Sequence, residues 1–252
     1  MAGLLDALIF SGAWVSLAAG ALAIAVSLAF GEAADPRVVG LAFTGTFAIY
    51  GIDRLRDRER DTGRAPIRSA FVSRWRGMLI ASTVTMTGAA ALFTFALGPG
   101  AVGVSAAAGA LGLLHRRLKD RVLFKAGYIT AAWIVVVLGL PALTARPDAA
   151  SVVWVGAVLA PVLLANAISF SVRDEEGLAA VLGRRRSLSI AVGSALVGLG
   201  FAALSPRAVR PLAAIALATL ASLLAFRADE RYAHVAVDGA LVTGALLSAA
   251  LS

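Results

Sequence analysis

Nine apolar stretches follow one another along this chain, most of them close to the roughly 20 residues that a helix needs to cross a bilayer. They cover residues 4–30, 37–56, 78–97, 99–115, 123–145, 151–172, 187–205, 211–226 and 234–251. Helix-breaking pairs such as Asp35-Pro36, Arg146-Pro147 and Ser205-Pro206 separate several of them. The sequence therefore predicts an all-α integral membrane protein in which residues 1–252 form a single transmembrane domain of nine helices.

Composition excludes the main alternatives to a membrane protein. Charged residues make up only 15% of the chain and apolar residues 60%, whereas a soluble domain carries about 25% charged residues. Disorder requires low hydrophobicity and high charge, so a disordered chain is excluded as well. The absence of cysteine excludes disulfides, thiolate metal sites and a cysteine nucleophile.

The basic residues predict the orientation in the membrane. Of the 23 Lys and Arg residues, 19 lie in or beside the loops that follow the second, fourth, sixth and eighth stretches. Because such residues accumulate on the cytoplasmic side, we expect the N-terminus and these loops inside and the C-terminus outside. The membrane is expected to be that of a prokaryotic cell. This bias and the attraction to anionic lipid account for the net charge of +8, so no nucleic-acid partner is expected.

A first group of acids continues the second stretch into the cytoplasm. Asp53, Asp57 and Asp61 are spaced by four residues and would form one column on a helix. Like charges at this spacing repel, so a cation between them would be stabilising, and Mg²⁺ prefers oxygen ligands. The alternative is a solvated helix whose acids are neutralised by the interleaved arginines.

A second group of polar residues closes the sixth stretch on the same membrane face. Asn166 precedes Asp174 by about two helical turns, and Glu175 and Glu176 follow. An amide within a span needs hydrogen-bond partners, although Asn166 would also serve simply to tie two helices together. Two acidic groups in equivalent positions, beside basic loops, predict a site for an anion and a metal.

These two groups resemble the motifs of the UbiA superfamily of intramembrane prenyltransferases. The first family motif reads Asn-Asp-x-x-Asp-x-x-x-Asp, and Asp53 and Asp57 match its last two acids. Ile49 and Tyr50 stand in place of its Asn and first Asp, and Asp61 adds an acid one turn later. The second often reads Arg-Asp-x-Glu-Gly-Asp after an upstream Asn; Asn166, Arg173, Asp174, Glu176 and Gly177 match it, and Leu178 replaces its last acid.

The resemblance implies nine helices around a lipophilic chamber, with Mg²⁺ and an isoprenoid diphosphate bound at its cytoplasmic end. The metal ligands would be Asp53, Asp57, Asp61, Asp174 and Glu176. Diphosphate would be held by Lys119, Lys125, Arg64, Arg68 and Arg173, although such residues also anchor loops to lipid headgroups. The residues expected to take part in catalysis are Asp53, Asp57, Asp174, Asn166 and Tyr50.

The function that we expect is Mg²⁺-dependent ionisation of an allylic diphosphate and transfer of its prenyl group to a lipophilic acceptor. Aromatic rings near the cytoplasmic half would shield the cation or anchor the helices at the interface: Phe47, Tyr50, Tyr128, Trp133 and Phe170.

His234 and Asp238 share a helical face and would hold the last helix or supply a base. The alternatives are an acceptor-free terpene cyclase or diphosphate lyase, and a transporter or other non-catalytic membrane protein.

Overall fold

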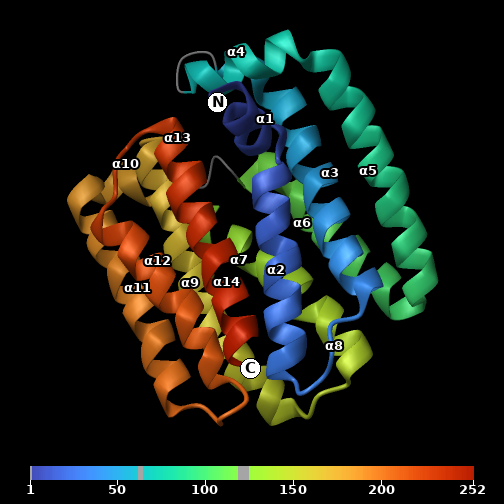
Figure 1. Ribbon diagram of the computed structural model, residues 1–252. Coiled ribbons are helices and arrows are strands. Elements are labelled where there is room, and N and C mark those ends of the chain that lie inside the picture. The colour runs from blue at the N-terminus through green and yellow to red at the C-terminus, as the bar shows by residue number, and fades with distance from the viewer. Residues whose placement is uncertain (1, 62–64, 119–124) are drawn as a thin grey trace.

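The computed structural model describes residues 2–61, 65–118 and 125–252, and every regular element within them is a helix (Figure 1). Side chains are described for all of these residues except 2, 58–61 and 113–118. The elements are α1 (Ala2–Ser11), α2 (Ala13–Ala29), α3 (Pro36–Asp61), α4 (Pro66–Arg74), α5 (Arg76–Leu97), α6 (Pro99–Leu118), α7 (Lys125–Val137), α8 (Gly139–Ala145), α9 (Ala149–Arg173), α10 (Leu178–Leu182), α11 (Arg184–Leu204), η1 (Arg210–Leu212), α12 (Ala213–Leu224), α13 (Glu230–Tyr232), the π-helical turn η2 (Ala233–Asp238) and α14 (Gly239–Leu251).

Six helices within this described part are long and apolar enough to cross a membrane. They cover Pro36–Asp57, Arg76–Leu97, Lys125–Ala145, Ala149–Arg173, Arg184–Leu204 and Glu230–Leu251. The bent pair α1 and α2 adds a seventh if it forms one span, and two shorter apolar helices cover Pro99–Gly112 and Arg210–Leu224. Large apolar side chains such as Leu92, Phe95 and Leu204 are about three-quarters exposed on the outside of the bundle. A multi-pass membrane protein is the class that this combination indicates.

The first predicted span is broken at Gly12, a feature that hydropathy does not reveal. Gly12 has a φ of 98°, in the left-handed region that favours glycine, and α1 and α2 meet there at 62°. A Cβ atom at this position would lie 3.5 Å from both Tyr50 Cβ and Arg54 NH1 of α3. The break therefore lets the chain turn directly against the part of α3 that carries the first acidic group.

The helices pack around α9, which lies beside α7, α11 and α12. On the other side of the bundle, α3 packs between α2 and α5. The largest core cluster joins residues of α2, α9, α12 and α14, including Leu22, Leu159 and Leu241. Gly244 permits one close approach, because a Cβ atom there would lie 2.5 Å from the Cα of Ile215.

The N-terminus, α4, α10 and α13 lie at one end of the bundle, which we call the α4 end, and the C-terminus lies at the other (Figure 1). Glu230 ties this end together: its Oε1 and Oε2 atoms accept hydrogen bonds from the backbone N–H groups of Ile67 and Arg68, at 3.2 and 3.0 Å. These groups belong to the first turn of α4, whose N-cap residue, Ala65, provides no side-chain acceptor. Arg231 beside it binds both carboxylate oxygens of Asp6 in α1.

Candidate functional site

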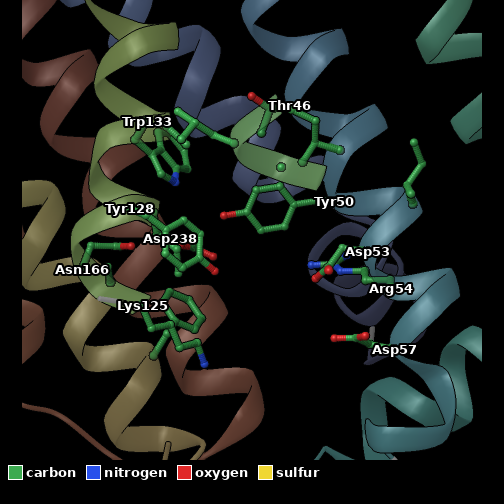
Figure 2. Close-up of a pocket in the computed structure, with 18 of the residues that line it drawn as sticks. Thr46, Tyr50, Asp53, Arg54, Asp57, Lys125, Tyr128, Trp133, Asn166 and Asp238 are labelled. Atoms are coloured by element: carbon green, nitrogen blue, oxygen red, sulfur yellow. The ribbon is translucent and has the colours of Figure 1, made fainter. Parts of the chain in front are cut away.

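A cavity of about 470 Å³ opens between α3, α6, α7, α9 and η2. Its lining includes nine of the residues predicted for catalysis, metal binding or diphosphate binding, and these come from four separate helices and the turn after α9. They are Tyr50, Asp53, Asp57, Arg68, Lys125, Asn166, Arg173, Asp174 and Glu176. Figure 2 shows the α3 side chains facing those of α7 and α9 across the open space. The fold thus gathers the two acidic groups around one cavity.

Helix α3 forms one wall of this cavity. Tyr50, Asp53, Arg54 and Asp57 all line it, because residues three and four apart share a helical face. Arg54 is only 4% exposed, and its NH1 atom has no hydrogen-bond partner within the described part of the chain. A buried guanidinium needs acceptors, so an anion in the cavity would satisfy it. In the sequence, Arg54 stands out only as one of the basic residues beside the loop after the second stretch, and the one signal of its role is its position between Asp53 and Asp57.

The end of α9 forms the opposite wall. Arg173 makes a two-point ion pair with Asp174, with N···O distances of 2.7 and 2.8 Å, and its guanidinium lies 5.1 Å from the centre of the Phe170 ring. The chain then turns sharply, because Glu175 and Gly177 both have positive φ values. This turn brings Glu176 back to the bundle, where its Oε2 lies 2.6 Å from Nζ of Lys125. Arg173 and Lys125, which both line the cavity, are therefore each paired with an acid.

The turn η2 contributes two buried polar residues that the sequence analysis left undecided. His234 and Asp238 are 6% and 3% exposed, and both line the cavity. Nδ1 of His234 lies 3.2 Å from Oδ2 of Asp238, and Nε2 lies 3.2 Å from NH1 of Arg173. Asn166 donates to the carbonyl of Val237 at 3.4 Å and lies beside the Asp238 carboxylate (Figure 2). The two residues, which the sequence places on one helical face, thus lie within hydrogen-bond distance of each other.

The rest of the cavity wall is mostly apolar. Helix α6 contributes small residues, including Ala108, Gly109 and Gly112, and α7 contributes Ile129, Ala132, Trp133 and Val136. Of the five aromatic residues proposed from the sequence, Phe47 is not among the lining residues and packs near Phe43 instead, with ring centres 6.5 Å apart. Tyr50, Tyr128, Trp133 and Phe170 do line the cavity. The space can therefore hold a molecule with a charged head and a hydrocarbon tail.

Three predicted residues cannot be compared with this geometry. The side chain of Asp61 and all of Arg64 and Lys119 lie outside the described residues. Among the side chains that are described, no three of the types His, Asp and Glu lie close enough together to form a metal site by themselves. The acids of α3 and those after α9 instead line the same cavity, and Asp53 and Asp57 lie across it from Lys125 and Asn166 (Figure 2).

Comparison with protein-family models, with curated proteins and with solved structures finds no match for this chain.

Proposed function

We propose that this protein is an intramembrane enzyme similar to the UbiA prenyltransferases, which ionises an allylic isoprenoid diphosphate with Mg²⁺ and transfers the prenyl group to a lipophilic acceptor. The observation that carries the proposal is one cavity that combines acids, cations and an apolar wall. Asp53, Asp57 and Arg54 stand on one side, Lys125 and Arg173 on the other, and Trp133 and its apolar neighbours complete the wall. This combination suits an amphiphile with a diphosphate head.

The donor set fits Mg²⁺. This ion is usually held by one or two protein carboxylates, with water and substrate phosphate oxygens completing its shell, so a ready-made group of three acids is not required. Asp53 and Asp57, one turn apart on α3, would supply carboxylate oxygens, and Asp61 is a further candidate. Asp174 and Glu176 would contribute after giving up part of their ion pairs. When bound, Mg²⁺ would neutralise charge on the leaving diphosphate.

The cations would bind the diphosphate directly. Arg54 has an unsatisfied guanidinium nitrogen, and Arg68, Lys125 and Arg173 line the same space. Positive groups held in a partly dehydrated site stabilise the negative charge that develops as the C–O bond breaks. Arg54 therefore joins the residues proposed from the sequence for binding the diphosphate.

The apolar wall would hold the prenyl chain and keep water from the cation. Small residues of α6 leave room for the chain, and the faces of Tyr128 and Trp133 offer electron-rich surfaces to the cation. In this arrangement the diphosphate lies toward the α4 end and the hydrocarbon toward the membrane interior.

The proposal also covers the membrane topology. We propose that α1 with α2, α6, and η1 with α12 each cross the bilayer in addition to the six long helices, which gives nine crossings. The α4 end would face the cytoplasm of a prokaryotic cell, with the C-terminus outside. The accumulation of Lys and Arg at the loops of this end supports that orientation.

An acceptor-free reaction, a terpene cyclase or diphosphate lyase, is the second candidate. The observation that favours it is the short connection from α9 to α11, which consists of the tight turn at Glu175–Gly177 and the five residues of α10. This connection offers little chain for holding a polar acceptor beside the cavity.

The test is diphosphate release by the purified protein in lipid nanodiscs with geranylgeranyl diphosphate and Mg²⁺. Release should require Mg²⁺ and should fall about 100-fold in Asp57→Asn and in Asp174→Asn, because each loses charge from the site. Asp148→Asn is the matched control, since Asp148 caps the start of α9 at the opposite end. No Mg²⁺-dependent release by the unaltered protein, or equal rates in all four proteins, would refute the proposal. A hydrocarbon or alcohol product with no response to lipophilic acceptors would favour the second candidate.

A further inference from the structure

Asp238 is a carboxylate inside the bundle that faces the cavity and that the proposed ionisation does not use. It is 3% exposed, and it lies in η2, away from the α3 and α9 acids. Figure 2 shows its carboxylate directed into the open space, with the hydroxyl of Tyr50 pointing toward it from the other side. An ionisable group at this depth is costly unless it is paired or has a function.

The hydrogen bonds of His234 determine what Asp238 can do. A guanidinium has only donors, so Nε2 of His234 must accept the hydrogen bond from Arg173. The hydrogen of the neutral imidazole then sits on Nδ1 and points at Oδ2 of Asp238. His234 is therefore fixed as a donor to Asp238, and it cannot take a proton at Nε2 while Arg173 occupies that atom.

Hydrogen-bond donors and cations surround the carboxylate of Asp238. Oδ2 accepts a hydrogen bond from His234, and the amide of Asn166 lies beside the carboxylate. The guanidinium groups of Arg54 and Arg173 are the cations that act on it, from α3 and α9. With His234 held as a donor, the carboxylate is the group of this pair that can receive a proton.

The depth of Asp238 matches the position of the reacting carbons. It lies four residues after His234 in η2, beyond the contact between His234 and Arg173. Arg173 borders the proposed diphosphate site, and the allylic carbons of the substrate are joined directly to the diphosphate. In the proposed function, these carbons would therefore lie in the layer that Asp238 and Tyr50 face. The π-helical geometry of residues 233–238 is a further sign, because such turns are frequent at functional sites.

We propose that Asp238 is the catalytic base that removes the proton from the cationic intermediate, with His234 as a positioning residue. This inference rests on the proposed function. Departure of the diphosphate takes the electron pair of the C–O bond and leaves an allylic cation. A C–H bond next to the cation then breaks, its electrons form a new C=C bond, and the proton moves to the carboxylate of Asp238. After transfer to an acceptor, the same carboxylate would take the proton that the acceptor loses.

The experiment measures how the cation is quenched in the absence of an acceptor. The purified protein in nanodiscs is given geranylgeranyl diphosphate and Mg²⁺, and the hydrocarbon and alcohol products are quantified for each diphosphate released. Loss of a proton gives a hydrocarbon, whereas capture by water gives an alcohol. In Asp238→Asn the hydrocarbon-to-alcohol ratio should fall about tenfold or more, because the amide still accepts from His234 but is no longer basic. Asp238→Glu should restore part of the ratio, and Asp148→Asn should keep it.

A purely structural role of Asp238 would change stability and the total rate but not this ratio. An unchanged ratio in Asp238→Asn would overturn the inference and indicate that the released diphosphate takes the proton. If that variant does not fold, the hydrocarbon-to-alcohol ratio is measured in Asp238→Ser, where the same fall is expected. Absence of diphosphate release by the unaltered protein would overturn the proposed function, and this inference with it; normal release with an unchanged ratio overturns this inference alone.

Discussion

Nζ of Lys125, in the first turn of α7, lies 2.6 Å from Oε2 of Glu176 in the turn that follows α9. The two side chains are 9% and 17% exposed, so this ion pair is largely shielded from water. Removing one partner of a buried pair costs about 3–5 kcal/mol, and their partial exposure reduces this to about 2 kcal/mol.

Lys125→Met should therefore lower the midpoint of thermal unfolding by about 4–8 °C, and the double variant with Glu176→Gln should lose less. The comparison is Arg37→Met, which breaks the exposed pair with Asp35 and should cost at most about 1 kcal/mol. Equal losses for the two single variants would show that the Lys125 pair is not shielded.

Gly12→Ala should destabilise the protein by about 1–2 kcal/mol, because its φ of 98° is unfavourable for a residue with a Cβ atom. Gly88→Ala is the control: Gly88 lies inside α5, nothing lies within 4 Å of the added Cβ, and the exchange should be neutral or stabilising. Chemical unfolding in detergent measures both. A neutral Gly12→Ala would contradict the left-handed break between α1 and α2.

Glu230→Gln should destabilise the attachment of α4 by about 1 kcal/mol. The amide nitrogen cannot accept the hydrogen bond that a carboxylate oxygen now accepts from Ile67 or Arg68. Hydrogen exchange of those two backbone N–H groups should become faster, whereas Glu32→Gln, at an exposed position, should leave it unchanged. Unaltered exchange in the Glu230 variant would rule out this cap.

The ion pair before α3 predicts a dependence on pH. The Arg37 side chain donates hydrogen bonds to the carboxylate of Asp35, and these lower the pKa of Asp35 in the folded protein. The contribution of this pair to stability is therefore complete above the unfolded pKa of about 3.9 and is lost as the pH falls through the lower folded value. The difference in unfolding midpoint between the unaltered protein and Asp35→Asn should be present at about pH 6 and shrink toward about pH 3. A difference that is the same at both pH values would contradict this.

The orientation can be tested by thiol labelling, because the chain contains no cysteine. Ala228→Cys lies in the exposed loop before α13, and Ala208→Cys lies in the exposed turn after α11. In intact cells a membrane-impermeant maleimide should label position 208 and should reach position 228 only after the cells are opened. The reverse pattern would place the α4 end outside the cell.

The helical class of the protein, and several residues that line the cavity, were predictable from local sequence. Hydropathy identified the helices because a bilayer favours apolar side chains over continuous runs of chain. The spacing of Asp53 and Asp57 placed them on one face of α3, and both line the cavity. That nine stretches each cross the membrane stays a prediction, since six helices among the described residues meet the length requirement and the bend at Gly12 is invisible to hydropathy.

The sequence by itself determined that this is a helical membrane protein and that its basic residues gather in alternate loops, because both properties depend on residues that are close together in the chain. Only the tertiary structure decided that α3, α7, α9 and η2 surround one cavity, and that Arg173 lies within hydrogen-bond distance of His234. It also decided that Arg54 is buried there with an NH1 atom that no described residue satisfies. These relationships join residues as far apart as 54 and 234. They depend on how the helices pack, and packing is decided by many weak contacts acting together rather than by any single motif.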